Sequence, residues 1–356
     1  MKQPNPAPSR VAFVFTSKTG MLKALDATPG HVSLEENDEP PPDLLAECDS
    51  EETIRAIQHS LEEKYTVYPV ESDADAYETL RRLRPDMVFN IAERLDGPNR
   101  ESHIPTVCEM LGLPYTGSDP LTLGLCLDKS RAKEILAHHG VPSAAFWTVE
   151  PDQDVPTSVT LPAIIKPLYE GSSKGIRDNS LVRTRQELEE RTAEITAQYR
   201  QPVIVEAFLP GREFTVGVLG NWPDLEILPI VEIDHGSLPA GASPIYSYEA
   251  KWIWDTSDKP LDIFTCPAAL PPELEQEIHD LVRRTWQVLR LRDWARIDVR
   301  LDEAGKAHVL EVNPLPGVLP KVEDNSCMPK AARTAGYSYS QLLHRVIEAA
   351  HARLKG

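Results

Sequence analysis

Short apolar runs alternate with amphipathic segments in the first hundred residues of the chain. The runs at 10–15 and 87–91 are mostly apolar, as is typical of strands that are buried on both faces. A third strand is expected at 65–70, and helices are expected at 53–63, 74–83 and 104–111. Because strands alternate with helices here, the pattern predicts a parallel α/β layer.

A different pattern begins near residue 128. Asp128 is the expected N-cap of a helix over 129–139, which Gly140 ends. From Glu213 onward the pattern indicates a long and mostly antiparallel region. The other expected elements are a strand at 163–166, a helix near 186–198, a strand at 203–206, a helix from Pro272 and a helix at 340–354. The expected fold class is therefore α/β, changing to α+β in the C-terminal part.

The length of 356 residues suggests two or three domains at roughly 150 residues each. A turn-rich segment at 113–118 marks the first expected boundary. We expect an N-terminal α/β domain over 1–117, a central domain over 118–205 and a C-terminal domain over 206–356.

Composition narrows the classes of function. The net charge of −18 disfavours a nucleic-acid partner, because proteins that bind phosphate backbones usually carry a basic face. Apolar runs stay well short of the roughly 20 residues that a membrane span needs, and the N-terminus lacks the apolar core of a secretory signal. The five cysteines are scattered and odd in number. We therefore expect a cytoplasmic protein without a membrane partner.

Much of the negative charge lies in one segment. From Ala24 to Ile54 there are ten acidic residues and no lysine or arginine, and Pro40, Pro41 and Pro42 interrupt regular structure. The simpler interpretation of this acidic, proline-rich excursion at 28–52 is a solvated surface segment. An acidic lid or a partner-docking segment is the alternative, and the sequence does not choose between them.

A β-hairpin is the most informative segment. Residues 294–301 and 307–313 alternate polar and apolar side chains, and Gly305 lies in the connector. A four-residue connector would place Asp298 opposite Glu311, and Arg296 opposite Asn313. Two carboxylates and an amide oxygen would then converge, which suits Mg²⁺. An arginine-paired surface hairpin is the structural alternative.

Three further motifs carry candidate chemistry. The strand that ends at Lys166 runs into a glycine–serine loop at 170–175, whose backbone N–H groups can approach phosphate oxygens. Residues 203–217 have the pattern of a strand, a turn and a strand, with Glu206 and Glu213 flanking the turn, and such an edge can hold an adenosine. Lys251 follows a glycine-containing loop and can arrive on a lid. Taken singly, each motif also fits an ordinary linker or surface position.

The order of these motifs resembles that in ATP-grasp enzymes, and most closely the D-alanine–D-alanine ligase family. The resemblance extends from the segment 109–117 to the segment 331–336. It implies an N-terminal parallel α/β domain, the pre-ATP-grasp domain, followed in the chain by an ATP-grasp fold. It also implies an enzyme that forms a peptide bond through an acyl phosphate, using ATP and two Mg²⁺ ions that Mn²⁺ can replace. The implied partners are small amino-acid or peptide substrates, and a homodimer is a family expectation.

The resemblance also implies residue roles. The nucleotide would be held by Lys129, Lys166, Gly171, Ser172, Ser173, Glu206, Phe208, Leu209, Glu213 and Lys251. The metal ligands would be Asp298, Glu311 and Asn313. The catalytic set would be Arg296 and the backbone N–H of Gly317 as an oxyanion hole, with Lys251 and Ser172. Ser326, Trp252 and Glu93 would contact the amino-acid substrates.

The departures from the family pattern cluster at the amino-acid sites. The segment 15–20 after the first strand lacks the family's glutamate for the donor ammonium, and Glu93 or Asp96 could supply that charge instead. Trp252 replaces a tyrosine. Three hypotheses remain: the family's own reaction, the same chemistry on other amino-acid or natural-product substrates, and a catalytically silent ATP-binding module with an acidic docking loop.

Overall fold

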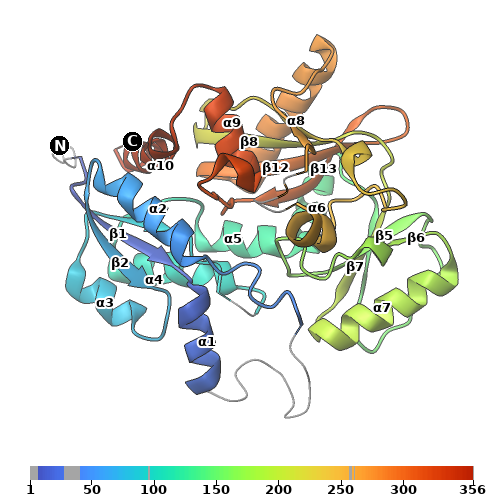
Figure 1. The fold of residues 1–356 in the computed structure, drawn as a ribbon, viewed down its shortest axis with the longest axis horizontal. Helices are drawn as coiled ribbons and strands as arrows, with labels where there is room; N and C mark the ends of the chain where they lie inside the picture. Colours follow the sequence, from blue (N-terminus) through green and yellow to red (C-terminus); the bar gives the residue numbers. More distant parts are fainter. Residues whose placement is uncertain (1–6, 28–40, 95–96, 256–258, 260, 356) are drawn as a thin grey trace.

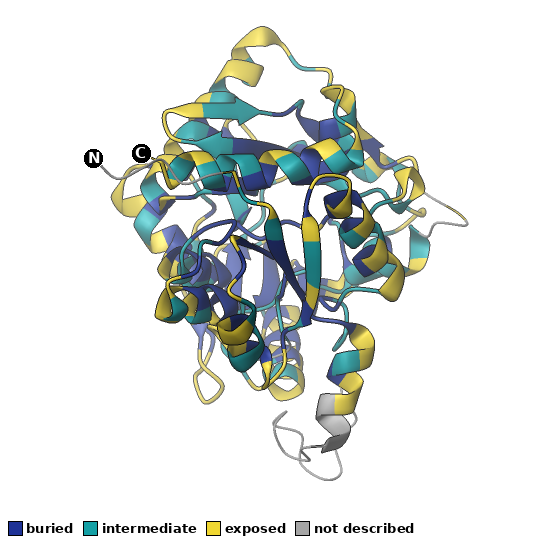
Figure 2. Ribbon diagram, turned by 90° about the vertical axis from the view of Figure 1, so that its left-hand side faces the viewer, coloured by how far each residue is buried: buried dark blue, intermediate teal, exposed yellow. Residues whose placement is uncertain are grey.

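The computed structural model describes residues 7–27, 41–94, 97–255, 259 and 261–355. Its strands form three sheets of three, six and four strands. Figure 1 shows the three-stranded sheet on one side of the molecule, with the other two sheets facing it across the middle. Strands are mostly buried and the outer faces of the helices are exposed (Figure 2). Within the described residues, no helix is long and apolar enough to cross a membrane.

The N-terminal layer is a parallel sheet of order β2-β1-β3, as the alternation of strands and helices predicts. Its central strand is buried along nearly its whole length, so helices can cover both faces. Ser50 caps one of these helices by accepting a hydrogen bond from the backbone N–H of Thr53. The elements of this layer are β1 (Arg10–Phe15), α1 (Lys18–Ala27), α2 (Glu51–Glu62), β2 (Thr66–Glu71), α3 (Ala76–Leu83), β3 (Met87–Asn90), η1 (Arg100–Ser102) and α4 (His103–Leu111).

The central part carries an antiparallel sheet of order β4-β7-β5-β6. Asp128 caps α6, as expected, by accepting hydrogen bonds from two backbone N–H groups of the first turn. Thr184 and Glu187 form a capping box at the start of α7. The elements are α5 (Pro120–Leu127), α6 (Lys129–His138), β4 (Phe146–Val149), β5 (Ala163–Pro167), η2 (Asp178–Ser180), β6 (Leu181–Val182), α7 (Arg185–Tyr199) and β7 (Val203–Ala207).

The C-terminal part is built on an antiparallel sheet of order β11-β10-β8-β12-β13, with β9 paired to β8. Its first elements are β8 (Glu213–Asn221), β9 (Asp224–Ile227), β10 (Val231–Ile233), η3 (His235–Ser237), the π-helix η4 (Glu249–Trp254) and β11 (Phe264–Thr265). The remaining elements are α8 (Pro272–Leu289), β12 (Asp293–Leu301), β13 (Ala307–Asn313), η5 (Val322–Asp324), α9 (Cys327–Thr334) and α10 (Tyr339–Arg353).

The β12–β13 hairpin has the predicted cross-strand pairs, but its connector and its register differ from the expectation. Asp298 lies opposite Glu311 and Arg296 lies opposite Asn313. The connector is longer than the expected four residues, however, because Leu301 pairs with Ala307. A register shift between Asp298 and Val299 absorbs the difference. This β-bulge therefore sets which polar side chains face one another.

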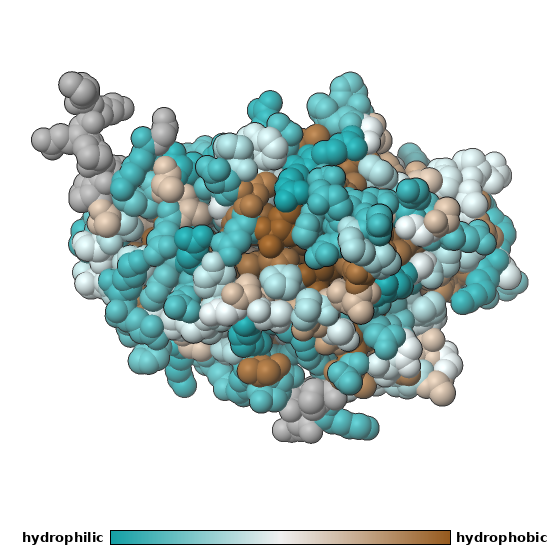
Figure 3. All heavy atoms as spheres, turned by 90° about the horizontal axis from the view of Figure 1, so that it is seen from above, coloured by the Kyte–Doolittle hydropathy of each residue, from teal (hydrophilic) through white to brown (hydrophobic). Residues whose placement is uncertain are grey.

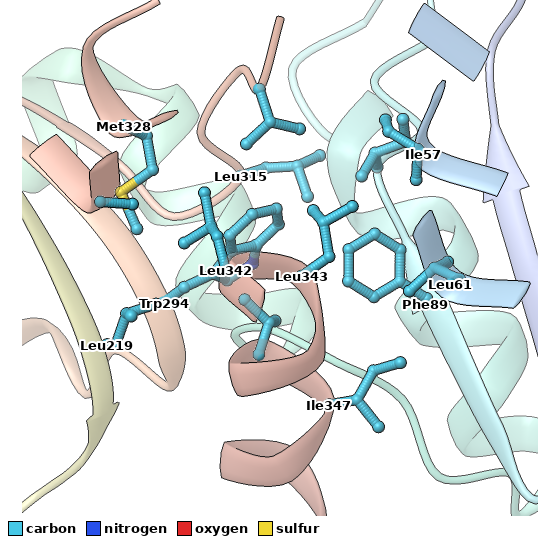
Figure 4. Packing of buried hydrophobic residues seen from close by; sticks show 14 of the residues in the cluster. Ile57, Leu61, Phe89, Leu219, Trp294, Leu315, Met328, Leu342, Leu343 and Ile347 are labelled. Carbon is cyan, nitrogen blue, oxygen red and sulfur yellow. The ribbon is translucent and has the colours of Figure 1, made fainter. Parts of the chain in front are cut away.

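A shared core fixes the N-terminal sheet against the C-terminal sheet. The ring of Phe89 from β3 lies 5.9 Å from the indole of Trp294 in β12, measured between ring centroids, and both are fully buried. Leu342, Leu343 and Ile347 from α10 fill the space between the two sheets (Figure 4). Because one apolar cluster spans both parts, their relative position is set by packing.

A buried carboxylate reinforces the same junction. Asp293, which is completely buried, accepts hydrogen bonds from the backbone N–H of Gly117 (2.8 Å), from Asn221 (3.0 Å) and from Arg353 (2.9 and 3.0 Å). The four groups come from the end of the N-terminal layer, β8 and α10 as well as β12. One side chain thus joins segments that are far apart in the sequence.

Helices at α1, α5 and α9 are additions to the expected pattern. No element was expected over the residues of α5, which follow the turn-rich segment 113–118, but Asp119 accepts a hydrogen bond from the N–H of Thr122 and Pro120 occupies the first turn. The strand β7 continues to Ala207, past the expected domain boundary at 205. Tertiary contacts extend local structure in these places beyond what periodicity indicates.

We predict that Phe89→Ala lowers the free energy of unfolding by about 3–5 kcal/mol, because it leaves a cavity beside Trp294. Urea denaturation of purified protein measures the change. Met110→Ala, at a side chain that is 70% exposed in the same layer, is the control and should change stability by less than about 0.5 kcal/mol. Equal losses for both variants would contradict the proposed role of this core.

Candidate active site

The three parts of the chain enclose a cavity of about 430 Å³. A smaller cavity of about 70 Å³ shares Lys251, Arg296 and Glu311 with it. All of the described residues to which the resemblance assigns a role line one of these two cavities, apart from Phe208. Phe208 instead packs under the guanidinium of Arg300, 4.7 Å from the ring centroid. The structure thus brings together side chains that are spread along the chain from Glu93 to Ser326.

Two lysines and a glutamate form an ion-pair cluster, of which Lys166 and Glu206 line the larger cavity. Lys166, near the end of β5, contacts Glu206 of β7 at 2.6 Å, and Lys133 of α6 contacts the other oxygen of the same carboxylate at 3.0 Å. Burial favours the neutral acid, but the two ammonium groups outweigh it and lower the pKa of Glu206 to about 2. Glu206 is therefore ionised at neutral pH and lies between two cations.

The second nucleotide candidate, Glu213, is also fully paired. Arg300 of β12 donates to it at 2.7 Å, and His235 lies 2.9 Å away. Burial opposes ionisation, but the hydrogen bond to His235 and the charge of Arg300 lower the pKa of Glu213 to about 2. This carboxylate faces the cavity as an anion whose orientation two partners fix.

The hairpin brings oxygen donors to the rim between the cavities. Arg296 makes a bidentate ion pair with Asp298 at 3.0 Å, and Asn313 donates to Asp298 at 3.1 Å. Glu311 pairs with Lys129 at 3.0 Å, and lysines 129 and 166 lower its pKa against the opposing effect of burial. Among the described residues no group of three His, Cys, Asp or Glu side chains is arranged to hold a metal ion. Two carboxylates and an amide are nevertheless the hard oxygen ligands that Mg²⁺ prefers, so the donor set fits this ion.

The glycine–serine loop at 171–175 closes one side of the cavity. Ser172 and Ser173 have φ values of 50° and 61°, a left-handed conformation that costs about 1–2 kcal/mol per residue outside glycine. Ser173 donates to the carbonyl of Tyr246 at 3.0 Å, and the indole N–H of Trp252 donates to the carbonyl of Ser172 at 3.2 Å. The loop therefore needs neighbouring segments to hold its shape.

Lys251, from the π-helix η4, lies directly over this loop. Its ammonium is 3.4 Å from the hydroxyl of Ser172 and 5.3 Å from the centroid of the Trp252 ring. Burial and the nearby charge of Arg296 lower the pKa of Lys251. The lid lysine expected from the sequence thus faces the rim that the hairpin forms.

At the other end of the cavity, Ser326 and Gly317 lie close together. The hydroxyl of Ser326 accepts from the N–H of Leu319 at 3.2 Å and donates to the carbonyl of Gly317 at 3.3 Å. Cys327, the next residue, also lines the cavity, and burial raises the pKa of its thiol to about 12. A protonated thiol is a poor nucleophile, so Cys327 offers this site shape rather than covalent chemistry.

The acidic segment is where the sequence interpretation was wrong. Asp43 and Glu47 are buried, with 1% and 7% of their surface exposed, so this part is not a solvated excursion. The chain returns to the end of β1, where the N–H of Asp49 donates to the carbonyl of Thr16 at 2.8 Å. Glu47 and Asp49 consequently line the cavity. Residues 28–40 of the excursion, and Asp96, lie outside the described residues.

An acid therefore does reach the site near the first strand, although the sequence after that strand lacks one. Glu93 also lines the cavity, and burial and the charge of Glu47 raise its pKa well above the usual range. Burial and Glu71 raise the pKa of Asp49 to about 7. These acids can change protonation with the charge of a bound molecule.

Sequence reasoning missed several charged residues of the site. Lys133 could have been found, because it lies four residues after Lys129 on the same face of α6. Arg300 lies two residues after Asp298, and the alternation along the strand places both on the same face. The others carry no comparable signal and make contacts with residues that lie elsewhere in the sequence. They are Glu47, Asp49, Arg100, Lys174 and His235.

The sequence matches a known protein family. Residues 135–348 match the family model described as "D-ala D-ala ligase C-terminus". The D-alanine–D-alanine ligase of Chromohalobacter salexigens is 35% identical over 76% of this chain and 79% of its own length. A Sinorhizobium fredii protein with the name "Uncharacterized protein y4sG" is 35% identical over 80% of this chain and 83% of its own.

Solved structures agree on the fold. The crystal structure of the Bacillus anthracis D-alanine–D-alanine ligase complexed with ATP superposes with a TM-score of 0.66 at 21% identity. Another crystal structure of the ligase from that organism gives 0.68 at 23% identity. Each comparison covers 98% of both chains. The chain therefore has the ATP-grasp fold expected from its sequence, with a parallel sheet in its N-terminal part.

We predict that Glu206→Gln costs about 3–5 kcal/mol of stability at pH 7, because it leaves Lys133 and Lys166 buried without an anion. The lowered pKa of Glu206 means that its contribution is complete above pH 4.5 and is lost as the pH falls toward 2. The difference between wild type and variant should thus be about 1 kcal/mol smaller at pH 4. Urea unfolding at both pH values tests this, with the exposed Glu150→Gln as a control that should change little at either pH.

Proposed function

We propose, because this chain belongs to the D-alanine–D-alanine ligase family of ATP-dependent C–N ligases, that it joins a carboxylate to an amine through an acyl phosphate. The observation that carries the proposal is a pair of adjoining cavities at which Lys129 and Lys166 of the central part lie close to Glu311 of the hairpin. Such a site can hold a triphosphate between cations and metal ligands.

The nucleotide would lie between the central and C-terminal sheets. Lys129 and Lys166 would bind the α- and β-phosphates, and the N–H groups of the 171–175 loop would cover the triphosphate. Glu206 and Leu209 would face the adenine, and Glu213 would hold the ribose hydroxyls. Phe208 lies behind this surface, where it supports Arg300.

The first chemical step would be attack of a substrate carboxylate on the γ-phosphorus, with ADP as the leaving group. Lys251 is close enough to the loop to neutralise charge on the transferring phosphoryl group. Asp298, Glu311 and Asn313 would hold Mg²⁺, which supplies Lewis-acid stabilisation of the phosphate charge when it is bound. Lys129, which now pairs with Glu311, would turn toward the nucleotide.

The second step would be attack of an amine on the acyl phosphate, with release of inorganic phosphate. Arg296 and the N–H of Gly317 both line the cavity and would stabilise the tetrahedral oxyanion. Ser326 would hold the carboxylate of the acceptor. The loop and the lid would exclude water, which otherwise hydrolyses the acyl phosphate.

The amino-acid end of the cavity differs more from the family pattern than the nucleotide end does. D-alanine is the family's substrate, but Trp252, Glu47, Asp49 and Glu93 give the amino-acid end a charge pattern of its own. The same chemistry on another acid–amine pair is the second candidate, which these residues favour. A specific site that buries polar groups rejects a molecule that leaves them unpaired.

Phosphate release from MgATP, measured against D- and L-amino acids singly and in pairs, tests the proposal. D-alanine alone should stimulate release and give a dipeptide by mass spectrometry if the family's reaction is retained. Release with a different pair would identify other substrates. Nucleotide binding without stimulated release across the panel would instead support a silent ATP-binding module.

We predict that Glu311→Gln abolishes ATP turnover, by at least about 10²-fold, while the fold is retained. The variant loses a charged metal ligand at the rim of both cavities. Circular dichroism and phosphate release measure the two properties. Glu303→Gln, in the exposed connector of the same hairpin, is the matched control and should be fully active. Normal turnover by Glu311→Gln would refute its assignment as a metal ligand.

We also predict that Lys251→Ala lowers kcat about 10²-fold with a smaller change in KM for ATP, since Lys251 would act mainly on the transferring phosphoryl group. Steady-state kinetics on the best substrate of the panel provides the test. Lys355→Ala, at an exposed position after α10, serves as the control. An unchanged kcat would argue against the role given to the lid lysine.

A further inference from the structure

A short piece of the acidic segment lies against the phosphate-covering loop. This piece, residues 43–47, is called the clamp segment here. The side chain of Asp43 has no exposed surface. It accepts hydrogen bonds from the backbone N–H of Gly175 at 3.0 Å and from the hydroxyl of Tyr199 at 2.7 Å, and it pairs with Arg177 at 3.5 Å. Figure 1 shows this stretch, before α2, extending from the N-terminal layer toward α7.

Glu47 holds the other end of the same loop. It accepts from the N–H of Gly171 at 2.8 Å and from Arg100 at 2.7 Å, and it pairs with Lys174 at 3.1 Å. Glycine is required at this contact, because a Cβ on Gly171 would lie 2.5 Å from the Glu47 carboxylate. Two carboxylates of the clamp segment therefore bind the first and last glycines of the 171–175 loop.

The segment that carries Lys251, residues 246–252, is called the lid, and it also contacts the loop. Trp252 and Lys251 contact Ser172, Ser173 contacts Tyr246, and the N–H of Tyr248 donates to the carbonyl of Ile176 at 2.8 Å. The loop thus lies between the clamp segment and the lid. Ser172 and Ser173 have a left-handed backbone conformation, which is unfavourable outside glycine. The contacts with neighbouring segments therefore stabilise this conformation of the loop.

The contacts of Asp43 differ in kind from those of Glu47. Glu47 and Gly171 line the cavity, so their interaction belongs to the site itself. Asp43 and Gly175 line neither cavity, and Asp43 reaches bound molecules only through the loop. A buried carboxylate facing an N–H, a phenol and a guanidinium makes strong charge-assisted hydrogen bonds. Asp43 is consequently placed to hold the loop without touching a ligand.

We propose that Asp43 is a positioning residue that clamps the 171–175 loop over the nucleotide site and so makes its closed state depend on the N-terminal part of the chain. The proposal rests on the function proposed above for what the loop covers, but the clamp itself is a property of the chain alone. Loss of the clamp lets the loop open locally, which weakens nucleotide binding and leaves the sheets intact.

Hydrogen exchange and nucleotide affinity test the clamp together. Asp43→Ala removes the acceptor, Asp43→Asn keeps one acceptor oxygen, and Asp152→Ala removes an exposed aspartate of the central part as the control. Exchange is measured by mass spectrometry on peptides that cover 170–177 and on peptides from β12 and β13. The affinity for the nonhydrolysable analogue AMPPNP with Mg²⁺ is measured by calorimetry on the same preparations.

We expect Asp43→Ala to speed exchange in the 170–177 peptides at least 10-fold, with Asp43→Asn intermediate and Asp152→Ala unchanged. Exchange in β12 and β13 should stay at the wild-type rate, and the Kd for AMPPNP should rise about 10-fold. Tyr199→Phe, which removes only the hydroxyl donor, should speed loop exchange by a few-fold and keeps the test valid if Asp43→Ala does not fold.

Unchanged exchange in the 170–177 peptides would overturn the proposal, as would a rise that is equal in the loop and in the hairpin. A wild-type protein that does not bind AMPPNP would instead count against the proposed function. The exchange experiment is then still decisive for the clamp, because it needs no ligand.

Discussion

A buried carboxylate stays ionised only when cations lie close to it, and this requirement links the parts of the chain. Glu206 of the central sheet is ionised because Lys133 and Lys166 both reach it. Glu311 of the hairpin relies in the same way on Lys129 of α6. Each ion pair spans two elements, so the positions of the sheets are tied to the charge balance of the cavity. Apolar packing around Phe89 and Trp294 then fixes that arrangement (Figure 4).

The same pairing prepares the site for an anionic ligand. In the proposed function, a triphosphate entering the cavity would meet these ammonium groups and would exchange one set of anionic partners for another. The charged side chains of the interior would then be compensated both without ligand and with it. The face in Figure 3 is mostly hydrophilic with apolar side chains in limited patches.

Local pattern predicted the hairpin well because its information is local. Alternation along 294–301 and 307–313 places Asp298 and Glu311 on facing positions, and the structure confirms that pairing. The connector length was wrong, and the bulge beside Asp298 corrected for it. A bulge depends on how two strands meet, which composition does not reveal. The start of α6 at Asp128 was likewise predictable, since an N-cap contacts only the first turn of its own helix.

The sequence by itself determined the fold class, the family and the motif residues that line the cavity, because short-range periodicity and ordered motifs encode them. Only the tertiary structure decided what the acidic segment does. Asp43 and Glu47 have no periodicity and resemble the exposed acids around them, yet their partners Gly175 and Gly171 lie more than a hundred residues away. Burial of a charge depends on which cation folds against it, and that meeting is a property of the folded chain rather than of any segment.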